Sequence, residues 1–240
     1  QVIISKSIMT KKKLVRFAET ATFKNVLQPG FKDVFRKDHP IKGKWREVFF
    51  KNDNPLVVEL GCGKGEYTVG LARKNHDKNF IGIDIKGARI WRGAKTALEE
   101  SLDNVMFLRT RIEFINSFFS KDEVNEIWLT FPDPQPKKKR KRLSSSGFLN
   151  QYKQFLKADG FLHLKTDSRL LYQYTLNLAV YNRLYIATAS EDVYQSHLSG
   201  DEMQIKTFYE KGFLEKGLRI CYMKFKLTDC ETINEPPEDE

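Results

Sequence analysis

The chain has 240 residues, of which 40% are hydrophobic and 30% charged, with 41 Lys and Arg against 31 Asp and Glu and a formal net charge of +10. This composition suits a folded domain with a full apolar core and excludes a disordered chain, a collagen and a disulfide scaffold. No stretch of about 18 uncharged apolar residues occurs, so we expect no transmembrane helix.

The first 50 residues form a basic N-terminal extension. Residues 1–50 carry 12 basic and 4 acidic side chains. Concentrated Lys and Arg favour a polyanionic partner such as nucleic acid, and a solvated basic surface is the alternative. The side chains of this arm expected to contact a nucleic-acid backbone are those of Lys6, Lys11, Lys12, Lys13 and Arg16. A solvated tail is the competing interpretation of the same residues.

From residue 51 to residue 228, short apolar runs alternate with helical patterns, which defines the main domain. Strands are expected at Leu56–Leu60, Phe80–Asp84, Asn104–Arg109, Glu126–Phe131, Gly160–Lys165, Leu184–Ala189 and Ile220–Leu227. Helices are expected at Trp45–Phe50, Tyr67–Lys74, Ala88–Ser101, Ile112–Phe119, Phe148–Leu156 and Arg169–Tyr181. This alternation predicts an α/β fold with a mostly parallel, seven-stranded sheet and helices on both faces.

A glycine loop follows the first strand, in the sequence E-L-G-C-G-K-G from Glu59 to Gly65. Gly61, Gly63 and Gly65 permit close approach of a ligand to the main chain, next to the free N–H groups of the following helix. The spacing differs from the GxGxxG of dinucleotide folds, and the Glu59 carboxylate would repel a pyrophosphate but favour a cation. Asp84 ends the second strand, where an acid can bind both ribose hydroxyls. Together these residues favour S-adenosylmethionine over a structural turn or a dinucleotide.

A proline-rich loop follows the fourth strand, with the sequence F-P-D-P-Q-P from Phe131, and continues into six basic residues, Lys137–Arg142. Prolines stiffen the loop and so present Asp133 with little entropy loss. The basic run fits a solvated loop, a nuclear localisation signal or a phosphate-binding segment. Its attachment to a stiff loop beside the predicted cofactor favours phosphate contacts.

The C-terminal residues 229–240 carry six acidic side chains and no basic one, which marks an acidic tail. Cys62, Cys221 and Cys230 lie far apart and lack the spacing of a zinc site or of a disulfide framework. The N-terminal apolar stretch is too short for a secretory signal. These features favour a cytoplasmic protein without a bound metal or a membrane partner.

Five motifs occur together: ELGCGKG, GIDIK (Gly82–Lys86), FPDPQPKKKRKR, KTD (Lys165–Asp167) and TFYE (Thr207–Glu210). On these motifs, from about Pro55 to Phe225, the chain resembles the tRNA (guanine-N7-)-methyltransferase family. The resemblance implies a Rossmann-like class I methyltransferase fold, S-adenosyl-L-methionine as cofactor and tRNA as partner. It also implies methyl transfer to N7 of a guanine in the tRNA variable loop. A monomer and a homodimer are both compatible with the sequence.

The resemblance assigns roles to particular residues. Glu59 and Asp84 match the family's cofactor-binding acids. Asp133 matches the acid at the junction of cofactor and guanine, and is the candidate catalytic residue. Lys137 matches a substrate-contacting lysine. The positions that match the guanine pocket are Asp167, Thr207, Phe208, Tyr209 and Glu210. The chain departs from the family at Gln135, where Trp is common, and in having no His within the basic run.

Guanine N7 carries an in-plane lone pair, so the reaction needs positioning more than a base. A carboxylate such as that of Asp133 would stabilise the positive charge that develops on the guanine ring. Asp167 and Glu210 can accept hydrogen bonds from guanine N1–H and the N2 amine. As alternatives, Asp167 caps the helix that begins near Ser168, and Thr207 and Tyr209 are ordinary structural residues.

Other residues with reactive side chains receive structural interpretations. His163 lies in an apolar strand and is expected to be a core residue, and Cys62 is expected to fill space in the glycine loop. Two further functions compete with the leading one. The first is another S-adenosylmethionine-dependent methyltransferase, acting on other RNA, protein or a small molecule. The second is a non-catalytic RNA-binding subunit that retains the fold.

Overall fold

The computed structural model describes residues 14–196, 198, 200–227 and 231–237, without the side chains of residues 201 and 202. The expectations for Lys6 and for Lys11–Lys13 of the basic arm lie outside the described residues. So do residues 229, 230 and 238–240 of the acidic tail.

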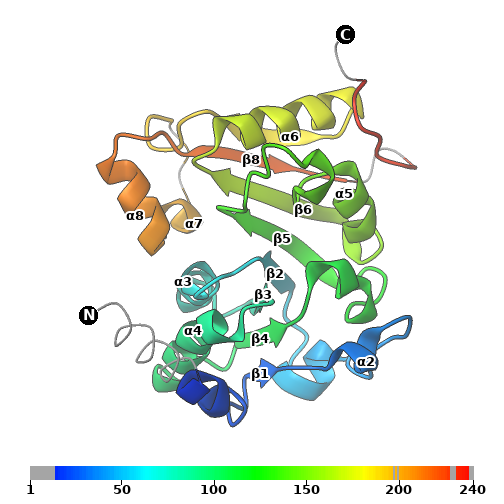
Figure 1. Ribbon diagram of the computed structural model, residues 1–240, viewed down its shortest axis with the longest axis vertical. Helices are drawn as coiled ribbons and strands as arrows, with labels where there is room; N and C mark the ends of the chain where they lie inside the picture. The colour runs from blue at the N-terminus through cyan, green and yellow to red at the C-terminus, as the bar shows by residue number, and fades with distance from the viewer. Residues whose placement is uncertain (1–13, 197, 199, 228–230, 238–240) are drawn as a thin grey trace, which may run out of the picture.

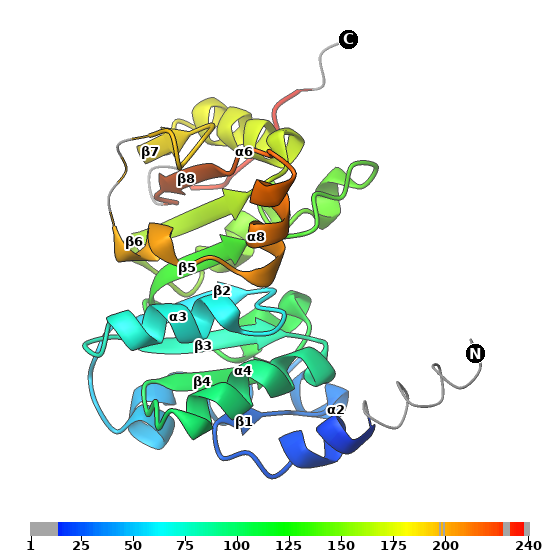
Figure 2. The ribbon, with the colours of Figure 1, turned by 90° about the vertical axis from the view of Figure 1, so that its left-hand side faces the viewer.

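One mixed sheet runs through the protein. Its strands are β1 (Val26–Leu27), β2 (Leu56–Leu60), β3 (Asn79–Asp84), β4 (Val105–Arg109), β5 (Val124–Thr130), β6 (Leu156–Thr166), β7 (Ile186–Ser190) and β8 (Cys221–Phe225). They lie in the order β1-β4-β3-β2-β5-β6-β8-β7, which Figure 2 shows as a vertical stack. β8 is antiparallel to both of its neighbours, and the other pairs are parallel. The mostly parallel sheet is confirmed, and the two-residue β1 is an eighth strand that the sequence pattern did not indicate.

Helices cover both faces of the sheet. The α-helices are α2 (Phe31–Val34), α3 (Glu66–Lys74), α4 (Gly87–Glu99), α5 (Ser146–Tyr152), α6 (Arg169–Tyr181), α7 (Asp201–Gln204) and α8 (Phe208–Glu215). Tighter or wider helical turns are η1 (Arg46–Phe50), η2 (Ile112–Ser117) and η3 (Lys139–Lys141), and residues 14–20 are also helical. Figure 1 shows α3, α4 and α8 on one side of the sheet and α5 on the other. No helix in the described part of the chain has the length and apolar character to span a membrane.

Side chains from alternate positions of the central strands form two apolar layers. On β2, Val58 points to one layer and Val57 to the other, as the period of two along a strand requires. The N-terminal segment joins the first layer, because Trp45 is fully buried there and its indole N–H donates to the Phe118 carbonyl at 2.9 Å. Part of the predicted basic extension therefore belongs to the hydrophobic core. The domain boundary expected at residue 50 stays a prediction.

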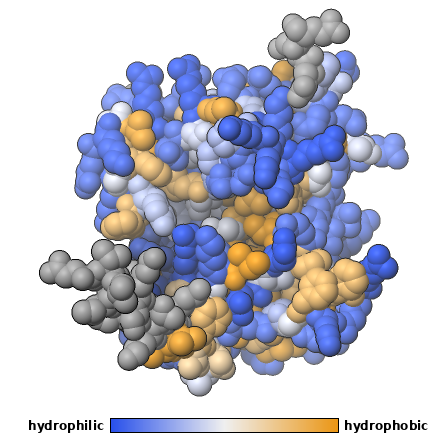
Figure 3. Space-filling model, in the orientation of Figure 1, coloured by the Kyte–Doolittle hydropathy of each residue, from blue (hydrophilic) through white to orange (hydrophobic). Residues whose placement is uncertain are grey.

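The carboxyl ends of the parallel strands meet at one edge of the sheet, which is where open α/β sheets bind ligands. The arrowheads of β5 and β6 in Figure 2 point to the side that faces the viewer in Figure 1. In the same orientation, Figure 3 shows a largely hydrophilic face with a hollow near its middle. The predicted site residues Asp84, Asp133 and Asp167 follow β3, β5 and β6 at this edge.

Candidate active site

The glycine loop between β2 and α3 requires its glycines. Gly61, Gly63 and Gly65 all have positive φ, at +78°, +57° and +70°. A Cβ on Gly65 would also lie 2.5 Å from the ring of Phe107. The N–H of Gly61 donates to the carbonyl of Ile83 at 2.8 Å, which ties the loop to β3. The loop is thus held where its main chain faces the carboxyl edge of the sheet.

Glu59, the acid of the loop motif, is 3% exposed and already hydrogen-bonded. Its carboxylate accepts from the Thr68 N–H at 2.9 Å and from the hydroxyls of Thr68 and Thr130. Burial raises the pKa of Glu59 to about 7, in spite of these hydrogen bonds. Cys62 beside it is buried, and burial raises the pKa of its thiol well above the ordinary value. The thiol is therefore un-ionised and fills space, as predicted.

Asp84 ends β3 with a fixed carboxylate. Its Oδ2 accepts from the Gly63 N–H at 3.0 Å, and its Oδ1 accepts from the Lys86 N–H at 2.7 Å. Each carboxylate oxygen has a second lone-pair site, so Asp84 can still accept hydrogen bonds from a bound ligand. The main-chain bonds orient it for that role.

Asp84 lines an open pocket of about 340 Å³ together with Gly61. The apolar part of its wall consists of Ile85, Ile112, Leu143 and Phe148. Arg111 also lines it and lies 3.5 Å from Glu113 in an ion pair. An acid for hydroxyl groups, left-handed glycines and apolar walls fit a nucleoside without phosphates, such as S-adenosylmethionine. The sequence motifs did not assign these apolar side chains to the cofactor, because Leu143 and Phe148 lie beyond the basic run and only the fold brings them to the same pocket as Ile85 and Ile112.

A second, smaller pocket of about 90 Å³ shares Gly61 with the first. Glu59, Thr130 and Phe131 line it from the β2 and β5 ends, and Thr207 and Tyr209 line it from α8 and its cap. The fold therefore brings two segments that were predicted separately, the glycine loop and the TFYE motif, to one place. This pocket is the candidate site for the group that receives the methyl.

Asp133 lines neither pocket itself, but it lies in the loop between Phe131, which lines the small pocket, and Gln135, which lines the large one. Its carboxylate is exposed and accepts from the main-chain N–H of Gln135 at 3.0 Å and from the Gln135 side chain at 2.9 Å. Phe131 and Gln135 both adopt positive φ, which folds the loop back on itself. Gln135, which departs from the family pattern, thus orients the candidate catalytic carboxylate.

The basic run divides into two parts. Lys137 to Lys141 are exposed, as expected for phosphate contacts. Arg142 is only 3% exposed, and its Nε donates to the Pro134 carbonyl at 3.0 Å while its guanidinium lies 4.3 Å from the Tyr174 ring centre. The expectation that all six bases face RNA is therefore wrong at Arg142. This side chain is buried and stabilises the proline-rich loop by its hydrogen bond to Pro134.

Asp167 follows β6 and is half-buried, and desolvation raises the pKa of its carboxyl. The alternative role as a helix cap is wrong, because the Ser168 hydroxyl accepts from the Leu171 N–H at 3.2 Å and caps α6. His163 on the same strand is 2% exposed, stacks on Trp128 at 3.9 Å and lies 2.9 Å from the Tyr222 hydroxyl. His163 is a core residue, as predicted.

The side chains of the TFYE segment, Thr207–Glu210, differ in their burial and in their partners. Thr207 caps α8 by accepting from the Glu210 N–H at 3.2 Å, and Phe208 is 64% exposed. Glu210 is fully buried, and its Oε1 lies 2.8 Å from Lys165 Nζ and accepts from the Tyr194 hydroxyl at 2.7 Å. Its Oε2 has no hydrogen-bond partner among the described residues. The sequence did not predict this ion pair, although a lysine in an otherwise apolar strand was a signal for one.

Comparisons with known proteins place the chain among methyltransferases. A family model described as a putative methyltransferase matches residues 53–223. A protein of Christiangramia forsetii named tRNA (guanine-N(7)-)-methyltransferase is 57% identical, over 91% of this chain and 99% of its own length. Proteins with the same name are 49% identical in Bacteroides thetaiotaomicron, covering 95% and 90%, and 36% identical in Brevibacillus brevis, covering 76% and 86%.

Solved structures support the fold. The crystal structure of the 16S rRNA methyltransferase KamB matches with a TM-score of 0.59 at 13% identity, over 77% of this chain and 92% of that one. The 30S ribosomal A1408 methyltransferase of an uncultured bacterium matches with a TM-score of 0.54 at 16% identity, covering 74% and 89%. At such low identity these matches establish only the class I architecture.

Proposed function

The chain belongs to the tRNA (guanine-N(7)-)-methyltransferase family, and we propose that the two pockets at the carboxyl edge of its sheet bind cofactor and target guanine on either side of Asp133. The activity is methyl transfer from S-adenosylmethionine to guanine N7 of tRNA. The position of Asp133, between residues lining both pockets, is the observation that carries the proposal. Relatives of 36–57% identity favour this function over another RNA methyltransferase or a non-catalytic subunit.

S-adenosylmethionine supplies the methyl group from a positively charged sulfur. In the larger pocket, Asp84 accepts from the ribose hydroxyls, and the apolar side chains of Ile85 and Ile112 enclose the adenine. Gly61, Gly63 and Gly65 let the main chain approach the cofactor closely. Glu59 places a negative charge near the positively charged sulfur of the cofactor. That positive charge in turn favours the ionised form of the Glu59 carboxyl.

The residues around the smaller pocket hold the guanine. Because N7 already carries a lone pair, the protein has to align it and exclude water. Asp133 stabilises the positive charge that develops on the ring. Asp167 is the acceptor for the guanine N1–H and N2 amine, and Thr207 and Tyr209 lie around the base. Glu210 is fully buried and lines neither pocket, so it positions this segment through Lys165 instead of making the predicted contact with guanine.

Basic residues beyond Asp133 bind the tRNA backbone. Lys137 is the first of five exposed bases on this loop, and Arg16 of the N-terminal segment adds to the same charge. Such contacts weaken with salt because each releases counterions from the phosphates. We assign the target to the variable loop of tRNA and the reaction to the cytoplasm. The described residues of one chain line both pockets.

The test is direct methylation. The purified protein is incubated with unmodified tRNA and labelled S-adenosylmethionine, and N7-methylguanosine is mapped by chemical cleavage. We expect one modified guanine in the variable loop. Methylation elsewhere, or none, would exclude the proposed target. Labelled cofactor that binds without any transfer would favour the non-catalytic alternative.

Binding of S-adenosylmethionine is expected to weaken below about pH 7. The pKa of Glu59 in the free protein is about 7, and the cofactor's positive charge favours the ionised carboxylate. Binding therefore releases a proton, and the affinity falls by up to about tenfold for each pH unit below 7. Calorimetric titration between pH 5.5 and 8.5 measures this dependence. Glu59→Gln serves as the control and is expected to give a flat profile, and an equally steep profile in that variant would rule out Glu59 as the cause.

A further inference from the structure

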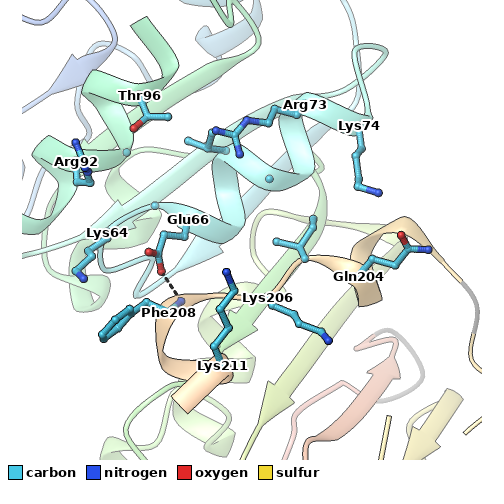
Figure 4. Close-up of a pocket in the computed structure, with 15 residues that line it drawn as sticks. Lys64, Glu66, Arg73, Lys74, Arg92, Thr96, Gln204, Lys206, Phe208 and Lys211 are labelled. Atoms are coloured by element: carbon cyan, nitrogen blue, oxygen red, sulfur yellow. Dashed lines mark hydrogen bonds between the residues drawn. The ribbon is translucent and has the colours of Figure 1, made fainter. Parts of the chain in front are cut away.

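A strongly basic pocket lies beside the active site, on the face covered by α3 and α4. We propose that it is a second binding surface for the tRNA sugar–phosphate backbone, separate from the basic run after Asp133; this inference rests on the proposed function. The pocket holds about 500 Å³. Its charged lining is one acid, Glu66, and six bases, which are Lys64, Arg73, Lys74, Arg92, Lys206 and Lys211. Figure 4 shows them on two walls, one from α3 and α4 and one from residues 204–211.

The positive charge of this pocket is only partly neutralised by the carboxylates that the structure describes. Glu66 accepts from the Phe208 N–H at 2.9 Å, and Arg73 is paired with Glu100 at 2.5 Å. Two of the other bases lie near aromatic rings. Lys64 Nζ lies 4.5 Å from the Phe208 ring centre, and Lys206 Nζ lies 4.7 Å from that of Tyr194.

Four bases of the pocket have no carboxylate partner among the side chains that the structure describes: Lys64, Arg92, Lys206 and Lys211. Bringing so many positive charges together raises the free energy of the folded protein, and an anion in the pocket lowers it again. Pockets for ordinary small ligands are lined mainly by apolar and aromatic groups. The lining therefore fits a ligand with several phosphates.

The pocket is continuous with the active site. Lys64 and Glu66 line both this pocket and the small pocket assigned to the guanine. Phe208 lines the basic pocket, and its neighbours Thr207 and Tyr209 line the small one. An RNA strand that places its guanine in the small pocket would therefore run its neighbouring phosphates into the basic pocket. This continuity favours an RNA backbone over a free nucleotide as the occupant.

Phe208 adds a feature typical of RNA-binding surfaces. It is a large aromatic side chain that is 64% exposed at the border of the two pockets. Unstacked RNA bases bind by stacking on exposed aromatic rings beside basic side chains. We therefore place a nucleotide that flanks the target guanine on the Phe208 ring, with its phosphate near Lys64. The basic run after Asp133 and the basic pocket then hold the RNA on two sides of the site.

Charge reversal tests this surface. In Lys206→Glu/Lys211→Glu, we expect the dissociation constant for unmodified tRNA to rise at least tenfold at low salt. The slope of log affinity against log salt is expected to fall by about 1.4–1.8, at 0.7–0.9 for each lost phosphate contact. Lys206→Arg/Lys211→Arg is expected to retain both properties. Lys216→Glu, an exposed lysine at the end of α8 outside the pocket, is the matched control and is expected to bind tRNA like the wild type.

Further measurements separate the possible failures. The affinity for S-adenosylmethionine is expected to be unchanged in all variants, which excludes misfolding as the cause of weaker tRNA binding. Phe208→Leu is expected to weaken tRNA binding without changing the salt slope, because stacking releases no counterions. The wild type could methylate tRNA while the double Glu variant binds tRNA with the same affinity and salt slope as Lys216→Glu. In that case the proposal that the basic pocket binds tRNA is wrong, and the proposed function stands. A wild type that neither binds nor methylates tRNA would overturn both.

Discussion

Replacing Asp133 by Asn is expected to lower kcat by about 10²–10³-fold, the loss seen when one preorganised electrostatic contact to a transition state is removed. Asn has the shape of Asp, and its side-chain oxygen can still accept from the Gln135 N–H, so the loop geometry is preserved. What is lost is the negative charge that, in the proposed function, stabilises the guanine ring. The ground states carry less charge on that ring than the transition state, so binding of tRNA and cofactor is expected to change by less than about threefold.

Single-turnover methylation at saturating tRNA and cofactor measures this effect without product release. Asp159→Asn is the control, because Asp159 is exposed and lies outside both pockets. Gln135→Ala leaves the carboxylate in place but removes the side-chain hydrogen bond that orients it, and a smaller loss than in Asp133→Asn is expected. Normal turnover in Asp133→Asn, with intact cofactor binding, would remove Asp133 from the mechanism.

The parallel sheet was predictable because its strands are short apolar runs bounded by turn residues. The bounds predicted for β2 and α6 agree with the structure at both ends. The helix predicted over Phe148–Leu156 was too long, because α5 ends at Tyr152 and Leu156 begins β6 beside Val124. Apolar spacing alone could not place that boundary, since Leu156 is buried in either structure. α8 was not predicted either, because its exposed Phe208 breaks the apolar stripe of a surface helix.

Site residues were predictable where a motif fixes the backbone, and less so where tertiary contacts decide. The three positive-φ glycines and Asp84 follow from the local sequence around two strand ends. By contrast, nothing within a run of six bases distinguishes Arg142, which is buried because the Pro134 carbonyl and the Tyr174 ring lie next to it. The four bases of the basic pocket without a described carboxylate partner come from the glycine loop, α4, the segment before α8 and α8 itself, so only the folded chain shows them as one surface.

Replacing Lys165 by Met is expected to destabilise the protein by about 3–5 kcal/mol, the cost of leaving a buried carboxylate without its partner. Lys165 and Glu210 are both fully buried, with Nζ and Oε1 2.8 Å apart. Lys165 Nζ also donates to the Ile205 carbonyl at 3.2 Å. One lysine on β6 thus fixes the chain on both sides of Thr207, which makes it a positioning residue for the small pocket.

The shift of the urea midpoint relative to wild type measures the loss, with Lys216→Met as the exposed control. In Lys165→Met/Glu210→Met no unpaired charge is buried, so most of the stability is expected to return. Activity is expected to stay low in this double variant, because it lacks the polar contacts of Lys165 with Glu210 and with the Ile205 carbonyl that hold the segment around Thr207 in place. Recovery of activity along with stability would instead show that the ion pair is purely structural. Stability and methylation are therefore expected to separate in this one variant, because apolar packing restores the first but not the polar contacts that position the small pocket.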